Sequence, residues 1–167
     1  MSELAAHDVD WVLSGSAVLV LYGATITPND LDVVPRLDQV NLGRLARMLD
    51  ELGAVPAHFP TWPESLSREQ CLAWSPDPSD PTCFDHLFVT SLGLLDLPPS
   101  LTGTFEALRR ESVAVDIAGI PVQVCNPHEV LDRLDGRRRA KDVERTAQYD
   151  LVRHHLHLGE PPVGTRL

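Results

Sequence analysis

Two aspartates separated by one apolar residue, Asp30-Leu31-Asp32, are the residues of this sequence best suited to chemistry. Alternate residues of a β-strand point to the same side, so both carboxylates share one face if this segment is extended. A hard divalent cation such as Mg²⁺ prefers oxygen ligands and readily bridges carboxylates to a triphosphate. The spacing therefore predicts a Mg²⁺ site, or a Mn²⁺ site, that would bind an NTP.

A glycine–serine turn, Ser14-Gly15-Ser16, precedes this pair by one short apolar segment. The first backbone N–H groups of a helix lack partners within the helix, so a turn of this kind at a helix start can hold a phosphate. A phosphate-binding turn followed by paired strand carboxylates supplies the parts of a metal-dependent nucleotidyl-transfer site. We expect Gly15 and Ser16 to face the triphosphate.

Chance is the competing explanation for the carboxylate pair. With 15 aspartates in 167 residues, an Asp-x-Asp tripeptide is expected about once by coincidence. Asp8-Val9-Asp10 is a second copy, to which we assign no role. Asp30 could instead close the turn at Thr27-Pro28-Asn29 as a polar strand entrance. Asp96 is a candidate third carboxylate, which could bind a second metal or accept a proton; alternatively it is an ordinary strand-end aspartate.

Length and composition indicate one globular domain over residues 1–160, with a Pro-rich insertion at 55–83 and a flexible tail at 161–167. The N-terminus shows no signal peptide and no apolar run is long enough to span a membrane. The three cysteines, Cys71, Cys83 and Cys125, are too few and too widely spaced for a disulfide framework or a zinc site. We therefore expect a cytoplasmic protein without a membrane partner.

Charge restricts the possible partners. A net charge of −10 argues against broad binding to nucleic acid. The positive residues are nevertheless concentrated near the C-terminus: Arg133, Arg137, Arg138, Arg139, Lys141 and Arg145. This basic run is either a solvated helix face or a surface that contacts phosphates.

The pattern along the chain alternates strands with helices, which is typical of an α/β or α+β protein with helices packed on a mixed sheet. We expect a strand at 10–13, a helix at 17–21, a strand at 31–34, and a helix at 42–52 capped by Asn41. In the Pro-rich insertion we expect no regular strand, with a short helix at 64–74.

The second half of the chain continues this alternation. Strands are predicted at 84–90 and 94–97, with a turn at Gly93, and a helix at 105–110. A hairpin is predicted for 112–117 and 120–124 around Ala118-Gly119. A helix capped by Asn126 should follow, and one continuous helix should span 141–158.

Several motifs together resemble the minimal nucleotidyltransferase family that includes the AbiEii-like toxins of toxin–antitoxin systems. They occur in this order: Ser14-Gly15-Ser16, Asp30-Leu31-Asp32, residues 41–45, residues 90–96 ending in Gly93-Leu94-Leu95-Asp96, residues 114–126, and Arg139-Ala140-Lys141-Asp142. The resemblance covers roughly residues 10–155. It implies a nucleotidyltransferase fold and the transfer of a nucleoside monophosphate from an NTP to a hydroxyl group.

The resemblance also implies roles for residues. Asp30, Asp32 and Asp96 would be the metal ligands and catalytic acids, and Gly15 and Ser16 would bind the triphosphate. Arg139, Lys141 and Asp142 match the basic–acidic motif that ends the family's core. The family's helix commonly carries a lysine at the position of Leu134; Arg133 or Arg137 could replace it in space.

The acceptor has three possible identities at this point. As a toxin relative, the chain would modify tRNA 3′ ends and bind a cognate antitoxin protein. As an antibiotic-modifying relative, it would adenylylate a small cationic drug, which an acidic surface attracts. The third alternative is a catalytically degenerate module that binds a nucleotide or a partner.

Overall fold

One seven-stranded mixed sheet runs through the molecule in the strand order β3-β4-β5-β2-β1-β7-β6. The computed structural model describes residues 1–61, 65–98, 103–136 and 140–162. The strands are β1 (Trp11–Leu13), β2 (Leu31–Pro35), β3 (Val55–Pro56), β4 (Leu87–Thr90), β5 (Gly93–Asp96), β6 (Val113–Ile117) and β7 (Ile120–Val124). Two pairs, β1–β7 and β2–β5, are parallel and the others are antiparallel. The predicted mixed sheet with helices is confirmed.

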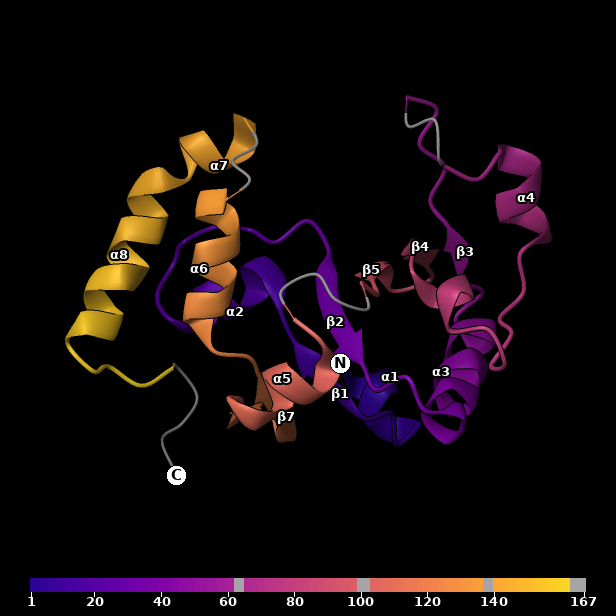
Figure 1. Cartoon of the computed structure of the whole chain (residues 1–167), viewed down its shortest axis with the longest axis horizontal. Coiled ribbons are helices and arrows are strands. Elements are labelled where there is room, and N and C mark those ends of the chain that lie inside the picture. The colour runs from indigo at the N-terminus through magenta and orange to yellow at the C-terminus, as the bar shows by residue number, and fades with distance from the viewer. Residues whose placement is uncertain (62–64, 99–102, 137–139, 163–167) are drawn as a thin grey trace.

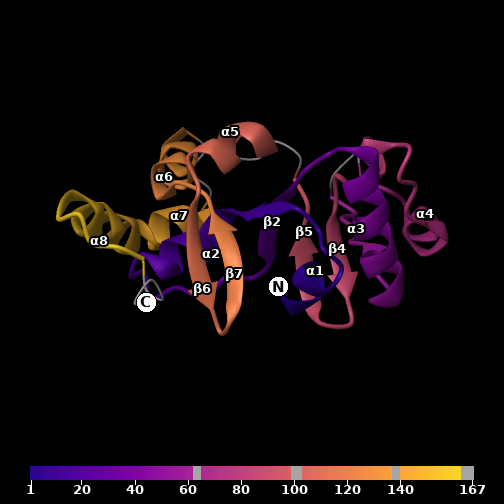
Figure 2. The ribbon, with the colours of Figure 1, turned by 90° about the horizontal axis from the view of Figure 1, so that it is seen from below.

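Helices lie at both ends of this sheet and against its central strands (Figures 1 and 2). They are α1 (Ser2–Ala6), α2 (Gly15–Leu21), α3 (Gln39–Glu51), α4 (Arg68–Ala73), α5 (Phe105–Arg110), α6 (Pro127–Gly136), α7 (Ala140–Glu144) and α8 (Thr146–His157), with a 3₁₀ turn at Pro81–Phe84. Figures 1 and 2 show α6, α7 and α8 at one end, and α3 and α4 at the other. The central strands lie between these two groups.

A continuous apolar core joins the sheet to the helices. One face of α3 is buried because its leucines recur at helical spacing, as Leu42, Leu45 and Leu49 show, whereas Arg47 is exposed. Val12 of β1 and Val33 of β2 are also inaccessible to solvent. Burial on both faces of the central strands fixes the register in which β2 presents its acidic residues.

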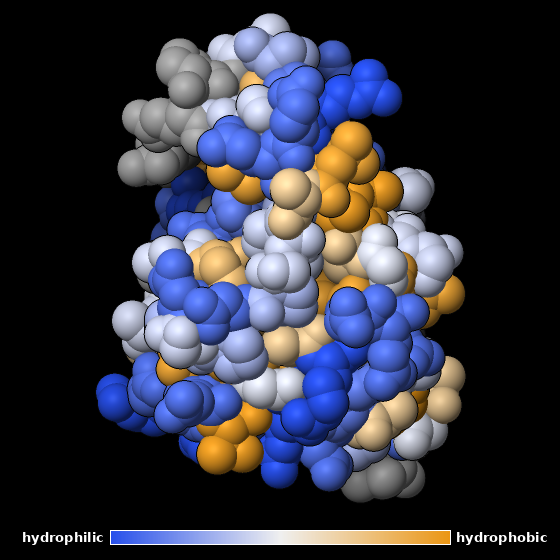
Figure 3. Space-filling view, turned by 90° about the vertical axis from the view of Figure 1, so that its right-hand side faces the viewer, coloured by the Kyte–Doolittle hydropathy of each residue, from blue (hydrophilic) through white to orange (hydrophobic). Residues whose placement is uncertain are grey.

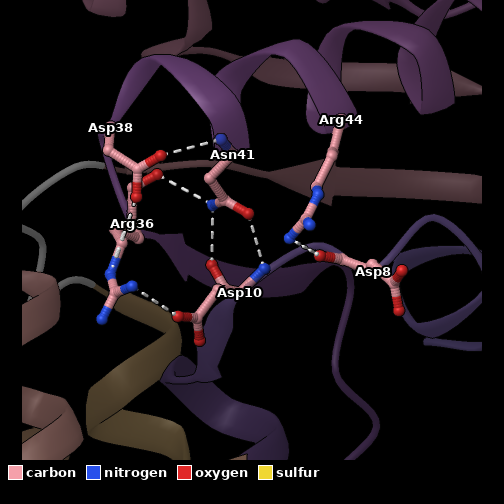
Figure 4. Close-up of polar contacts among 6 residues, drawn as sticks. All are labelled: Asp8, Asp10, Arg36, Asp38, Asn41 and Arg44. Carbon is pink, nitrogen blue, oxygen red and sulfur yellow. Dashed lines mark hydrogen bonds and ion pairs between the residues drawn. The ribbon is translucent and has the colours of Figure 1, made fainter.

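The start of α3 differs from the prediction. Asp38, not Asn41, is the N-cap, and its carboxylate accepts a hydrogen bond from the Asn41 backbone N–H at 2.9 Å. The buried Asn41 side chain instead accepts from the Asp10 N–H and donates to the carbonyls of Asp10 and Arg36 (Figure 4). The prediction failed because Asp and Asn are equally good caps, and only the tertiary contact with Asp10 distinguishes them.

The C-terminal helix and the Pro-rich insertion also need correction. The single helix expected at 141–158 is two helices, α7 and α8, which meet at Arg145. The insertion does contain a strand, β3, which pairs with β4, and its helix is shorter than predicted. Phe84 belongs to the 3₁₀ turn, so β4 begins only at Leu87. The α1 helix was not predicted.

The surface is mixed in character. Figure 3 shows hydrophilic residues interrupted by separate hydrophobic areas on the side that carries α3 and α4. The exposed large apolar side chains include Leu72 of α4 and Val89 and Leu94 of the β4–β5 hairpin. None of the helices within the described residues is long and apolar enough to cross a membrane. All three cysteines are free thiols.

Candidate active site

A pocket between the sheet and the C-terminal helices brings the predicted acids and several cations together. The sheet and α2 supply Gly15, Ser16, Asp30, Asp32 and Asp96. The helices supply the opposite wall: Val130, Arg133, Leu134, Lys141, Asp142, Arg145 and Tyr149. Carboxylates therefore face guanidinium and ammonium groups across one cavity.

Strand register explains why the acids meet. In the parallel pair β2–β5, Asp32 lies directly opposite Asp96, and Leu31 lies opposite Leu95. Because side chains alternate along a strand, Asp32 and Asp96 point to one face of the sheet while the two leucines point to the other. Asp30 precedes β2 on the same face as Asp32. The contiguous pairing joins residues that are more than 60 positions apart in the sequence.

Asp32 lies tightly against the turn that precedes α2. The Ser14 N–H donates to the Asp32 carbonyl at 3.0 Å, and the Ser16 N–H hydrogen bonds to the Asp32 carboxylate. A Cβ added at Gly15 would lie 1.8 Å from Asp32 Oδ2, and Gly15 has a φ of +65°. Only glycine fits this position, since any side chain would collide with the carboxylate. The turn thus holds Asp32 as well as bordering the pocket.

The surroundings of Asp32 and Asp96 disfavour the ionised form of both side chains. Burial, followed by the nearby carboxylates of Asp30 and Asp96, raises the pKa of Asp32 to about 6. Burial, followed by Asp30 and Asp85, likewise raises the pKa of Asp96 to about 6. Like charges held together in a partly dry site disfavour full ionisation, and a bound cation would relieve the repulsion.

The helical wall supplies the compensating positive charge. Arg133 lowers the pKa of both Asp32 and Asp96, although burial and the neighbouring acids outweigh it. Leu134, where the resemblance implies a lysine, lines the pocket as an apolar residue. The neighbouring Arg133 therefore supplies a positive charge close to the acids, as the sequence had suggested.

Asp142 and Tyr149 form a buried pair at the back of the pocket. The Tyr149 hydroxyl donates to Asp142 Oδ1 at 3.0 Å, and both residues are almost completely buried. Burial, assisted by Asp142, raises the pKa of Tyr149, so the phenol stays protonated. Asp142 thus has a structural partner in addition to its place in the pocket.

Most of the predicted site residues lie in this pocket. Gly15, Ser16, Lys141 and Asp142 line it together with the three acids, and their roles remain predictions. Arg139 lies outside the described residues. Tyr149 was not singled out from the sequence, although its spacing of seven residues from Asp142 would place both on one face of the continuous helix expected at 141–158.

The carboxylates of the pocket suit an open site for a divalent cation rather than a closed one. Among the described residues, no group of three or more His, Cys, Asp and Glu side chains is arranged so that all could hold one metal ion. Mg²⁺ usually takes one or two protein carboxylates and completes its shell with water and phosphate oxygens. Asp32, whose pKa is raised by burial and by the nearby carboxylates of Asp30 and Asp96, fits such an open site because all three side chains are hard oxygen donors.

Comparison with known proteins supports the fold. No protein-family model matches the chain, and no curated protein matches its sequence. Its structure resembles a solution structure of the antibiotic-resistance factor ANT(2'')-Ia, with a TM-score of 0.55 at 16% identity over 93% of this chain and 79% of that chain. The chain has a nucleotidyltransferase fold.

A second solved structure gives the same result. The crystal structure of ANT(2'')-Ia in complex with adenylyl-2''-tobramycin matches with a TM-score of 0.54 at 14% identity, over 93% of this chain and 84% of that chain. Identities this low establish the architecture alone.

Proposed function

We propose that the protein transfers a nucleoside monophosphate from an NTP to a hydroxyl group and releases pyrophosphate. The observation that carries this proposal is the single pocket in which Asp32 and Asp96 face Arg133 and Lys141. Carboxylates suit a cation and an acceptor hydroxyl, whereas the basic wall suits a triphosphate. The fold that the chain shares with ANT(2'')-Ia also supports nucleotidyl transfer.

The reaction breaks one phosphoanhydride bond and forms one phosphate ester. The acceptor oxygen attacks the α-phosphorus, and pyrophosphate leaves with the electron pair of the Pα–O–Pβ bond. Asp96 takes the hydroxyl proton, since a carboxylate with a pKa of about 6 is a competent base near neutral pH. Arg133, Lys141 and Arg145 neutralise the phosphate charge.

A divalent cation would be held by Asp32 with Asp30 or Asp96 as a second ligand. When bound, it would neutralise negative charge on the phosphates as a Lewis acid. Gly15 and Ser16 would border the triphosphate, and the Ser16 hydroxyl would be the donor to it, since the Ser16 backbone N–H already bonds to Asp32. Arg139 would add a further cation, and Lys141 and Asp142 would complete the motif.

Two acceptor classes are proposed. An AbiEii-like toxin that modifies tRNA 3′ ends, with a cognate antitoxin as partner, follows from the ordered sequence motifs. A small cationic acceptor is favoured by the net charge of −10 and by the ANT(2'')-Ia complex with an adenylylated aminoglycoside. Three cations of the basic run line the pocket, where the triphosphate would engage them, and this weakens the case for an extended RNA surface.

One experiment tests the reaction and separates the acceptors. The protein is incubated with Mg²⁺ and each α-labelled NTP, together with total RNA or a panel of aminoglycosides. Labelled product and equimolar pyrophosphate in either arm support nucleotidyl transfer and identify the acceptor class. NTP binding without product in both arms would replace the proposal with the degenerate binding module.

A further inference from the structure

The segment that leads to Asp30 is attached to α8 rather than to the sheet. Residues 23–30 join α2 to β2 and run out toward α8 before returning to the sheet (Figure 1). Gln148 Oε1 accepts hydrogen bonds from both the backbone N–H and the hydroxyl of Thr25, at 2.7 and 2.9 Å. Arg145 Nη2 donates to the Thr27 carbonyl at 3.2 Å.

These contacts follow one face of the helix. His155 Nδ1 lies 3.2 Å from the Tyr22 carbonyl, at the start of the same segment. Arg145, Gln148 and His155 are spaced by three and seven residues, which places them on one helical stripe. The segment therefore runs antiparallel to α8 and contacts it at successive points.

Gly23 provides independent evidence that the segment is fitted to the helix. A Cβ at this position would lie 2.5 Å from His155 Nδ1, and Gly23 has a φ of +98°. A residue with a side chain would both strain the backbone and displace the imidazole. The close approach of this backbone to α8 thus depends on a glycine.

The attachment links the two walls of the pocket. Arg145 lines the pocket and also contacts Thr27, while Gln148 is absent from the pocket lining and its side-chain oxygen accepts from Thr25. We propose that Gln148 is a positioning residue, which holds the 23–30 segment so that Asp30 keeps its place opposite the helical wall. This inference rests on the proposed function, because the position of Asp30 matters through nucleotidyl transfer.

The expected effect follows from where Gln148 lies. Thr25 is exposed, so its N–H can bond to water when the amide is removed, and the fold should lose little stability. A misplacement of a reacting group by about 1 Å can cost roughly 100-fold in rate. Loss of Gln148 should therefore reduce turnover far more than it reduces stability.

The test compares Gln148→Ala with Gln148→Glu, which keeps an acceptor oxygen at the same reach. The Ala variant should lower kcat roughly 10- to 100-fold, with KM for the NTP changed by less than about threefold. Its peptides covering residues 23–30 should take up deuterium faster, whereas β1 and β7 should not change. The Glu variant should restore kcat and exchange toward wild type.

A control variant guards against a general effect of altering α8. His157→Ala truncates an exposed residue of the same helix and should leave kcat and exchange unchanged. Unchanged kcat in Gln148→Ala, or equal losses in the Ala and Glu variants, would overturn the positioning role. Faster exchange throughout the sheet would also overturn it, by showing general destabilisation. A wild-type protein without transferase activity would refute the proposed function, while the exchange measurement would still decide whether Gln148 holds the segment.

Discussion

Two copies of the same tripeptide pattern occupy opposite electrostatic situations in this molecule. Asp8-Val9-Asp10 precedes β1, and Asp30-Leu31-Asp32 enters β2. The Asp10 carboxylate pairs with Arg36 at 3.2 Å, and the Asp10 backbone binds the Asn41 amide (Figure 4). The Asp8 carbonyl accepts from Arg44. In this copy the Asp10 carboxylate and the backbone groups of Asp8 and Asp10 bind other parts of the structure.

The second copy gathers like charges instead. Asp32 is buried, lies beside Asp30 and Asp96, and has a pKa of about 6. Groups in such a position destabilise the folded chain in the absence of a cation, which is typical of functional sites. Asp-x-Asp spacing alone therefore carries no chemistry. A third carboxylate, Asp96 on the neighbouring strand β5, makes the second copy a candidate site.

Removing a pocket acid should have the largest effect. Asp32→Asn or Asp96→Asn should lower nucleotidyl transfer about 1,000-fold or more, because charge stabilisation worth several kcal/mol is lost and each 1.4 kcal/mol is about tenfold in rate. Single-turnover transfer of a labelled nucleotide measures this directly.

Asp10→Asn is the matched control, since it makes the same isosteric change in the other copy. Its turnover should stay within about twofold of wild type, because a surface substitution away from the site shifts free energies by only about 0.5 kcal/mol. Comparable losses in Asp10→Asn and Asp32→Asn would refute the functional distinction between the two tripeptides.

The fold and most of the pocket could be predicted from sequence for a simple reason. Alternation of carboxylate and leucine in Asp30-Leu31-Asp32 fixes which face of β2 is polar, and the apolar stripe of α3 fixes where the core lies. Local patterns of this kind do not depend on distant partners. The family resemblance then implied that Asp96 belongs with Asp30 and Asp32, which spacing alone could not provide, whereas the pairing of β2 with β5 was seen only in the structure.

The parts that sequence could not give depend on tertiary contacts. Asn41 looked like a helix cap because its bonds to Asp10 bridge 31 positions in the chain. A role for Gln148 could not be predicted, since a single glutamine on a helix is ordinary and only the structure places Thr25 beside it. The final helix is interrupted at Arg145, where the sequence contains no proline or glycine that would predict a break.

Around Asp8-Val9-Asp10, the buried Asn41 side chain should contribute most to the free energy of unfolding. Asn41→Ala removes three hydrogen bonds and takes these partners from the Asp10 N–H and the Arg36 carbonyl, while the Asp10 carbonyl still accepts from the Arg36 N–H, so the free energy of unfolding should fall by about 1–3 kcal/mol. Urea denaturation measures the change. Turnover at a temperature where the variant is folded should match wild type; a specific loss of kcat would connect this cluster to the active site.

Acidification should lower the transfer activity of the pocket while it raises the stability of the folded chain. Transfer should decline as the pH falls through about 6, because Asp32 and Asp96 become protonated. The pKa of Asp32 is higher in the folded chain than its ordinary value of 3.8, so the folded state binds the proton more tightly. Its contribution to stability therefore increases as the pH falls from about 6 toward about 4.

Asp32→Asn mimics this protonation permanently. At pH 7–8 and without metal, it should raise the free energy of unfolding by roughly 1 kcal/mol while abolishing turnover. Denaturation of wild type and variant across pH checks the sign, because the advantage of the variant should shrink toward pH 4. A variant less stable than wild type at pH 8 would show that the Ser16 and Gly15 contacts outweigh the charge repulsion.

The smallest expected effect belongs to the Arg36–Asp10 ion pair. Both side chains are substantially exposed, at 47% and 38%, so water and salt screen their attraction. Asp10→Asn should therefore cost about 0.2–1 kcal/mol at low ionic strength and less in 0.5 M salt, while the backbone bonds from Asp10 to Asn41 persist. Urea denaturation at both salt concentrations measures the difference. A loss above about 2 kcal/mol that salt does not reduce would mean that the carboxylate, and not the Asn41 amide, anchors this copy.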